Sequence, residues 1–166
     1  MIITAPTQSD GRLLPNLFLA GGISNCPDWQ SYVLSKIGHI DYNIYNPRRI
    51  DWNYDANAEI ESTKQIEWEH KYLAQSDEIL FWFPKETVCP ITLLEYGKFL
   101  MIGYKRLYVG VHPEYIRKLD IYVQTKLERP DIEIVDNLDD LIQVVLNAST
   151  ERKEQHTRTK NALLCR

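Results

Sequence analysis

One glutamate, Glu95, stands where a carboxylate could attack an electron-poor carbon. An apolar segment, 78–83, predicts a buried strand, and a helix predicted for 91–102 carries Glu95 in its first turn. The amino-terminal end of a helix stabilises a nearby carboxylate by about 0.3–1 kcal/mol, which favours the ionised form at neutral pH. Such a carboxylate suits glycosyl transfer, because an oxocarbenium-like transition state needs a carboxylate on one face and an acid on the leaving-group side.

The same glutamate also fits a purely structural role. Thr92 and Glu95 match the Ser/Thr-x-x-Glu pattern of a capping box. In that motif the glutamate only returns to the backbone N–H of the residue that begins the helix. Spacing alone favours this second interpretation.

Two further segments could touch a ligand. Gly21 and Gly22 end the predicted strand 16–22, where glycines allow either a close backbone approach to a ligand or simply a tight turn. Arg48 and Arg49 follow the next predicted strand and could hold a phosphate or carboxylate through paired hydrogen bonds. A surface ion pair with the acidic helix that follows is the favoured alternative for these arginines.

Aromatic and acidic side chains complete the candidates. Trp52 offers a stacking surface for a nucleobase, whereas Trp82 belongs to the predicted strand core. Glu67 and Glu69 lie on a helix predicted for 57–75, and one of them is expected to face the pocket unless both are solvated. No histidine has a partner at metal-ligand spacing, so we predict neither a metal nor a cofactor.

The elements that must position these residues alternate between strands and helices. Predicted strands are 16–22, 42–45, 78–83, 106–111 and 131–135, and predicted helices are 28–37, 57–75, 91–102, 113–119 and 138–146. This order predicts a three-layer α/β domain of flavodoxin-like (Rossmann-like) type, with a five-stranded parallel sheet in the order 2-1-3-4-5. Such sheets bind ligands at the carboxyl ends of their strands, where the candidate residues lie.

Length and composition place further limits. The 166 residues suit a single domain, expected over 1–148, with a polar tail over 149–166 that is either disordered or packed on a neighbouring subunit. The net charge of −4 argues against a nucleic-acid polymer as partner. The three cysteines form no CxxC pair, which favours a reducing, cytoplasmic setting. No apolar stretch approaches the roughly 20 residues of a membrane span.

Several segments together resemble a known family. They are 18–23 with Asp28 and Trp29, then 45–49, 66–69, 76–87, 89–97 and 109–115. Their order and spacing are similar to those of the nucleoside 2-deoxyribosyltransferase family, in its nucleoside 2-deoxyribosyltransferase-like branch, over about residues 16 to 120.

The resemblance implies a retaining double displacement in which Glu95 attacks a deoxynucleoside and a free nucleobase accepts the sugar. It also implies that Glu69 helps to hold the substrate, that no cofactor is needed, and that the active sites are shared within a homo-oligomer, dimer or higher. A role in nucleotide salvage follows from that activity. The remaining residues expected to bind the substrate are Gly21, Gly22, Asp28, Arg48, Asp51, Trp52, Phe83, Cys89 and Pro90.

Two positions depart from the family pattern. Cys89 replaces an aspartate that acts near the base, and Phe18 replaces a tyrosine that steadies the nucleophile. A neutral thiol is a poor general acid, so the acid is expected to be Asp51, Glu69, a water or a group of a neighbouring subunit. Two alternatives therefore stay open: a deoxynucleoside 5'-monophosphate N-glycosidase, suggested by the paired arginines, and a non-catalytic nucleotide-binding or sensing module.

Overall fold

A parallel sheet forms the centre of the protein, whose computed structural model describes residues 1–49 and 58–164. Its strands are β1 (Ile2–Thr4), β2 (Asn16–Gly21), β3 (Asn43–Asn46), β4 (Glu78–Phe83), β5 (Arg106–Val111) and β6 (Ile134–Val135). They lie in the order β1-β3-β2-β4-β5-β6, and every pairing is parallel. All six residues of β4 are buried, as expected for a central strand covered on both faces.

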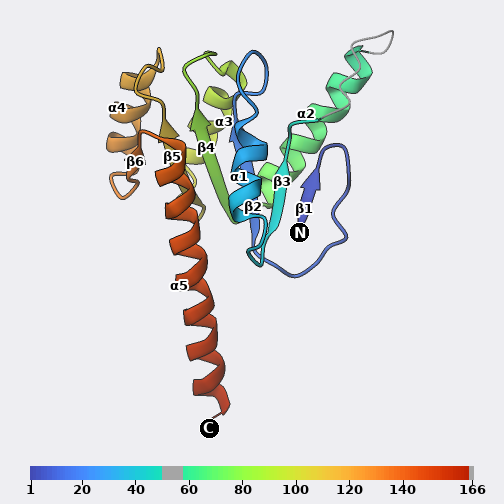
Figure 1. Ribbon diagram of the computed structural model, residues 1–166, viewed down its shortest axis with the longest axis vertical. Helices are drawn as coiled ribbons and strands as arrows, with labels where there is room; N and C mark the ends of the chain where they lie inside the picture. The colour runs from blue at the N-terminus through green and yellow to red at the C-terminus, as the bar shows by residue number, and fades with distance from the viewer. Residues whose placement is uncertain (50–57, 165–166) are drawn as a thin grey trace.

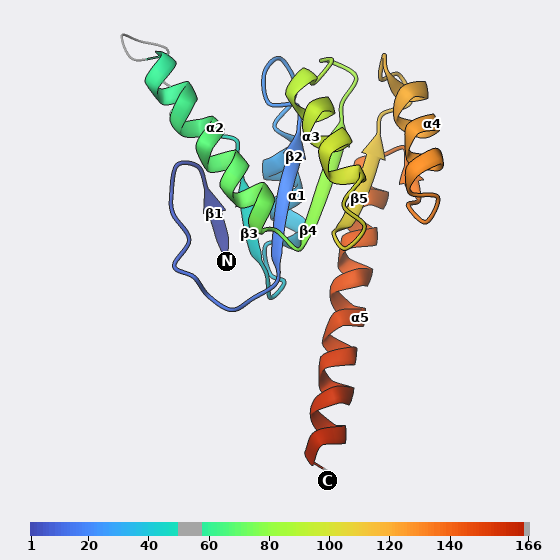
Figure 2. The ribbon, with the colours of Figure 1, turned by 180° about the vertical axis from the view of Figure 1, so that it is seen from behind.

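Helices cover both faces of this sheet. The helices α1 (Trp29–Ile37) and α5 (Leu138–Leu164) pack on one face, in front of the strands in Figure 1. The opposite face carries α2 (Ala58–Gln75), α3 (Pro90–Leu100) and α4 (Lys118–Glu128), which Figure 2 shows from behind. Each face has its own apolar cluster, so the protein is a three-layer α/β structure.

The predicted topology is confirmed for the five strands that the sequence indicated, which lie in the order 2-1-3-4-5. The strand β1 was not predicted, because three residues are too few to show a periodic pattern; it extends the sheet beyond β3. The short helix predicted for 113–119 is wrong. The helix of this region is α4, whose apolar pattern is weak because it buries only Ile121 and Thr125.

The closing helix is much longer than predicted. It was expected to end at 146, but α5 continues to Leu164, and its second half projects beyond the sheet (Figure 1). Arg152 donates a hydrogen bond to the buried carboxyl of Glu78, and Lys153 forms a 2.9 Å ion pair with Asp41. Residues 149–164 of the predicted tail are thus helical, and contacts of Arg152 and Lys153 attach the first turns to the rest of the domain, while the domain division at 148 stays a prediction.

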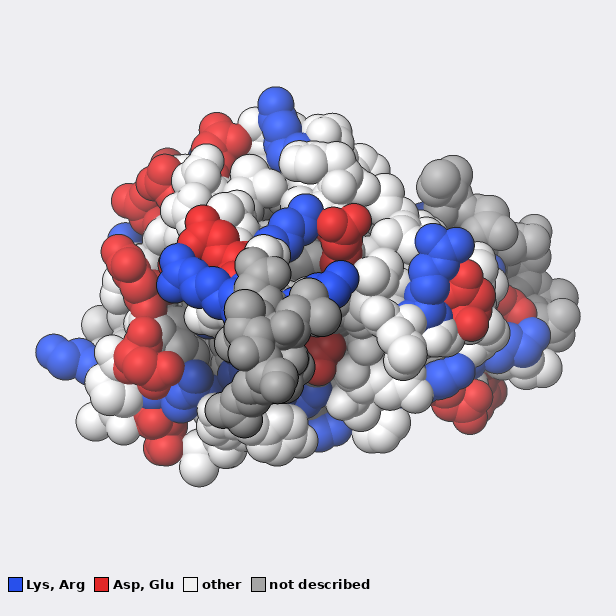
Figure 3. Space-filling view, turned by 90° about the horizontal axis from the view of Figure 1, so that it is seen from below, with Lys and Arg blue, Asp and Glu red and all other residues white. Residues whose placement is uncertain are grey.

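Acidic and basic side chains are interspersed on the face from which α5 projects, as Figure 3 shows from below. Among the described residues, no helix combines the length and apolarity needed to cross a membrane.

Candidate active site

A cavity of about 300 Å³ lies at the carboxyl end of β2, between α2 and α3. Six of the predicted site residues line it: Gly21, Gly22, Glu69, Cys89, Pro90 and Glu95. Hollows of about 510 and 620 Å³ occur near the amino-terminal ends of β4 and β5. The cavity of about 300 Å³ is the candidate site, because it lies at the carboxyl end of β2 and parallel sheets bind ligands at the carboxyl ends of their strands.

The start of α3 decides how Glu95 is held. Cys89 is the N-cap, in the left-handed region with a φ of 51°, and Pro90 follows it as the first helical residue. Thr92 is therefore inside the helix, and the capping-box interpretation of Glu95 is wrong. The prediction that Glu95 lies in the first turn is wrong as well, since the first turn of α3 contains no acidic residue.

The surroundings of Glu95 favour its protonated form. Burial, and then the nearby Glu69 carboxyl, raise the pKa of Glu95 to about 8, although Lys98 acts in the opposite direction. Burial also raises the pKa of Glu69, against the effect of a hydrogen bond from Gln65. The expectation that the helix end keeps Glu95 ionised is thus wrong, and the two interacting carboxyls retain a proton near neutral pH.

Cys89 is buried, and its thiol stays protonated. Its Sγ lies 3.4 Å from the carbonyl oxygen of Thr87, to which it donates. Burial is the main cause that raises the pKa of Cys89 to about 12, so the thiol is neutral at physiological pH. This agrees with the inference that Cys89 does not supply the acid found at this position in the family. Phe18, the other departure, lines the same cavity with an apolar ring.

The two glycines are explained by close packing of the protein itself. A Cβ on Gly21 would lie 2.5 Å from Cζ2 of Trp29, and one on Gly22 would lie 2.7 Å from Cγ2 of Thr87. The carbonyl oxygen of Gly22 accepts a 2.8 Å hydrogen bond from Nε1 of Trp29. Larger residues would therefore displace the walls of the cavity.

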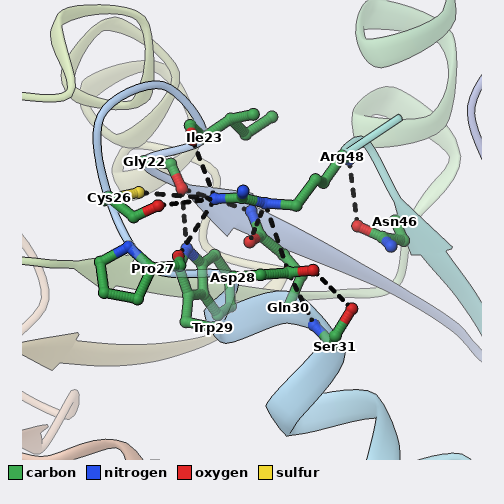
Figure 4. Close-up of polar contacts among 10 residues, drawn as sticks. All are labelled: Gly22, Ile23, Cys26, Pro27, Asp28, Trp29, Gln30, Ser31, Asn46 and Arg48. Atoms are coloured by element: carbon green, nitrogen blue, oxygen red, sulfur yellow. Dashed lines mark hydrogen bonds and ion pairs between the residues drawn. The ribbon is translucent and has the colours of Figure 1, made fainter. Parts of the chain in front are cut away.

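Arg48 holds the loop between β2 and α1 in place (Figure 4). Its Nε donates to Oε1 of the fully buried Gln30 at 2.8 Å. One terminal nitrogen donates to the carbonyl oxygens of Ile23 at 2.9 Å and Pro27 at 3.1 Å, and Nε lies 3.3 Å from Oδ1 of Asp28. Because Ile23 lines the cavity, Arg48 fixes part of the cavity wall.

The remaining predicted site residues have varied positions. Asp28 caps α1 by accepting a 3.0 Å hydrogen bond from the backbone N–H of Ser31. Phe83 is completely buried and packs against Tyr96 and Tyr115, so it belongs to the core. Arg49 forms a 3.0 Å ion pair with Glu61 of the acidic helix, as the ion-pair alternative predicted, but the pair is partly buried rather than at the surface.

Two predicted site residues lie outside the described residues, and two buried glutamines at the site were not predicted. Asp51 and Trp52 are outside the described residues, so their predicted contacts stay predictions. Gln30 and Gln65 were not singled out, although both are buried and both hold a cavity-wall group. The spacing of Gln65 four residues before Glu69 was the only available signal. Within 1–49 and 58–164, no cluster of residues could hold a metal ion.

The fold and the site together define a class: parallel three-layer α/β proteins with a carboxyl pair in a cavity at the carboxyl edge of the sheet. A family model described as "Nucleoside 2-deoxyribosyltransferase like" matches residues 14–115, which include the whole cavity lining. The chain belongs to the nucleoside 2-deoxyribosyltransferase-like family. A search of curated proteins finds no match.

Proposed function

We propose that the protein transfers 2-deoxyribose between nucleobases through a covalent deoxyribosyl-Glu95 intermediate. The observation that carries this proposal is the pairing of Glu95 with Glu69 in one cavity, where both carboxyls have a raised pKa. Family membership supports glycosyl transfer as the reaction class. A pair that retains one proton can provide a nucleophile and an acid at the same time.

The surroundings favour a proton on Glu95, so the reaction begins with transfer of that proton to Glu69, which leaves Glu95 as the attacking carboxylate. A carboxylate oxygen of Glu95 forms a bond to C1' while the bond from C1' to the base nitrogen breaks. The electron pair of that bond leaves with the base, which takes the proton from Glu69. An incoming base then attacks C1' and returns a proton to Glu69, and Glu95 departs as a carboxylate.

The apolar part of the cavity suits the flat face of a base. Phe18, Pro90 and Ile91 line it together with the two carboxyls. Ligand sites of this kind combine apolar walls with a few polar groups that fix orientation. The rest of the proposal rests on the family: a homo-oligomer, dimer or higher, with shared active sites, and a role in nucleotide salvage. The absence of a CxxC pair among the three cysteines supports a cytoplasmic setting.

The phosphate-specific alternative finds less support. Arg48 is engaged with Gln30, Asp28 and loop carbonyls, and Arg49 with Glu61. A 5'-monophosphate N-glycosidase is therefore an outcome of the test rather than the leading hypothesis, and so is a module that binds nucleotides without turnover.

The test is base exchange followed by chromatography. Wild type incubated with deoxyinosine and adenine should form deoxyadenosine, while Glu95→Ala and Glu95→Gln should lose at least about 10³-fold in rate. Glu69→Gln should slow the reaction by about 10²–10⁴-fold, because it removes the acid. The matched control is Glu67→Gln, an exposed glutamate of the same helix, which should leave the rate unchanged.

Each rival has a distinct result. Free base released from a deoxynucleoside 5'-monophosphate without any acceptor base would identify the hydrolase. Thermal stabilisation by nucleosides or nucleotides, without turnover of any common combination of deoxynucleoside and free base, would identify the binding module. Either result would overturn the proposal that the protein is a transferase.

A further inference from the structure

Gln65 lies behind the cavity wall, one helical turn before Glu69 on α2. Its side chain is buried, with 7% of the residue exposed. The amide nitrogen Nε2 donates two hydrogen bonds of 2.8 Å, one to Oε1 of Glu69 and one to the carbonyl oxygen of Pro47. Glu69 and Pro47 both line the cavity, so this amide ties the carboxyl to the end of β3.

The orientation of the amide is fixed by its neighbours. Both partners of Nε2 are acceptors, so exchanging the nitrogen and oxygen of Gln65 would set oxygen against oxygen. In the observed orientation, Oε1 of Gln65 is buried and has no hydrogen-bond partner among the described residues. An unsatisfied buried acceptor costs free energy. Gln65 is therefore explained by what its N–H groups hold in place.

Among the described residues, few charged or titratable groups surround the Glu69 carboxyl. Glu95 lines the cavity from α3, the exposed Lys98 of the same helix lowers the pKa of Glu95, and Cys89 lies before that helix as a neutral thiol. On α2, Glu61 is paired with Arg49. Gln65 is the group whose hydrogen bond favours the ionised form of Glu69 against the effect of burial.

We propose that Gln65 is a positioning residue that occupies Oε1 of Glu69, so that Oε2 carries the exchangeable proton of the Glu69–Glu95 pair. This proposal rests on the proposed function for its catalytic meaning, but the arrangement itself can be tested without turnover. A donated N–H stabilises a carboxylate more than a carboxylic acid. Gln65 thus sets how the proton divides between the two glutamates and holds Glu69 at a constant place beside the leaving base.

The first measurement is a titration of carboxyl carbons by NMR in the unliganded protein, with Glu95 and Glu69 assigned from their Gln variants. Gln65→Met keeps a long unbranched side chain and removes both N–H groups. The titration midpoint assigned to Glu69 should move to higher pH by about one unit. An unchanged midpoint overturns the proposal.

A double variant separates this effect from general disturbance of α2. With Glu69→Gln already present, adding Gln65→Met should leave the Glu95 titration where it was, because the hydrogen-bonded carboxylate is gone. If Gln65→Met shifts the titration midpoint of Glu95 equally with and without Glu69→Gln, Gln65 acts on the cavity as a whole. If Gln65→Met does not fold, Gln65→Asn, which is polar but too short to reach both partners, should give a shift in the same direction.

Activity supplies the second measurement. In the transferase assay, the limb of the kcat/KM profile at higher pH should move to still higher pH in Gln65→Met, because that limb reports loss of the proton from Glu69 and the variant destabilises the Glu69 carboxylate. An enzyme that shows no transfer would contradict the proposed function. An unchanged titration midpoint of Glu69 in Gln65→Met would contradict only the role proposed for Gln65.

Discussion

Gly22 and Cys89 meet across the wall of the candidate cavity. A Cβ on Gly22 would lie 3.0 Å from Sγ of Cys89 and 2.7 Å from Cγ2 of Thr87. Gly22→Ala must therefore push the loop before α3 away from the end of β2, and with it the cap of the helix that carries Glu95. We expect a loss of about 10²-fold in kcat/KM, the usual scale for a displacement of about 1 Å at a reacting centre.

A second glycine provides the matched control. Gly97 lies in the interior of α3, and a Cβ there would meet nothing within 4 Å. Gly97→Ala should therefore stabilise the protein by about 0.5–1 kcal/mol through helix propensity, measured by urea denaturation, with activity unchanged. Equal activities for Gly22→Ala and wild type would show that the wall tolerates the added methyl group.

Arg48 should act as a clamp on the cavity wall rather than as a phosphate ligand. Lysine cannot reproduce the forked hydrogen bonds to Gln30 and the loop carbonyls, so Arg48→Lys should cost about 1–3 kcal/mol of unfolding free energy. The KM for a deoxynucleoside and for its 5'-monophosphate should rise by the same factor. Arg12→Lys, at an exposed ion pair, is the control and should change neither. A rise confined to the monophosphate would instead assign Arg48 to phosphate binding.

Much of the fold followed from local patterns, because buried parallel strands are continuous apolar runs and the loops after them are polar. The long α5 did not follow, since its residues 150–160 are exposed and polar and carry no apolar stripe. Its order depends on contacts between distant residues, such as Arg152 with Glu78, which spacing along the chain does not show.

The site was predictable to a similar degree. The resemblance pointed to Glu95 and Glu69, and the cavity brings them together. The protonation of Glu95 was not predictable, because it depends on burial and on a neighbour 26 residues away rather than on position in the helix. The roles of Gln30 and Gln65 were also hidden, since a buried amide gives no periodic or compositional signal.

The link between Arg152 and Glu78 should stabilise α5 on the sheet. Glu78 is completely buried and also accepts hydrogen bonds from Tyr42 at 3.2 Å and Tyr108 at 2.8 Å. Arg152→Ala leaves that carboxyl without its cationic partner, and because the arginine is partly exposed we expect a loss of about 1–3 kcal/mol in urea denaturation.

Two further variants test the origin of that loss. Adding Glu78→Gln to Arg152→Ala should recover part of the stability, because an amide needs no counter-charge. Arg158→Ala removes an exposed pair with Glu154 in the projecting part of α5 and should cost less than about 0.5 kcal/mol. Similar losses for Arg152→Ala and Arg158→Ala would mean that the buried partner contributes nothing.

Stability should fall with rising pH because of Glu95. Its pKa is about 8 in the folded protein against an ordinary value of 4.5, so between these values the folded state holds a proton that the unfolded state has lost. The free energy of unfolding therefore decreases from about pH 4.5 to pH 8 and levels off above. Glu95→Gln removes this penalty, and its stability relative to wild type should be greater at pH 9 than at pH 5 by on the order of 1–3 kcal/mol. Urea denaturation at both pH values measures the difference, with the exposed Glu67→Gln as control; the same difference from wild type at both pH values would show that Glu95 ionises freely inside the cavity.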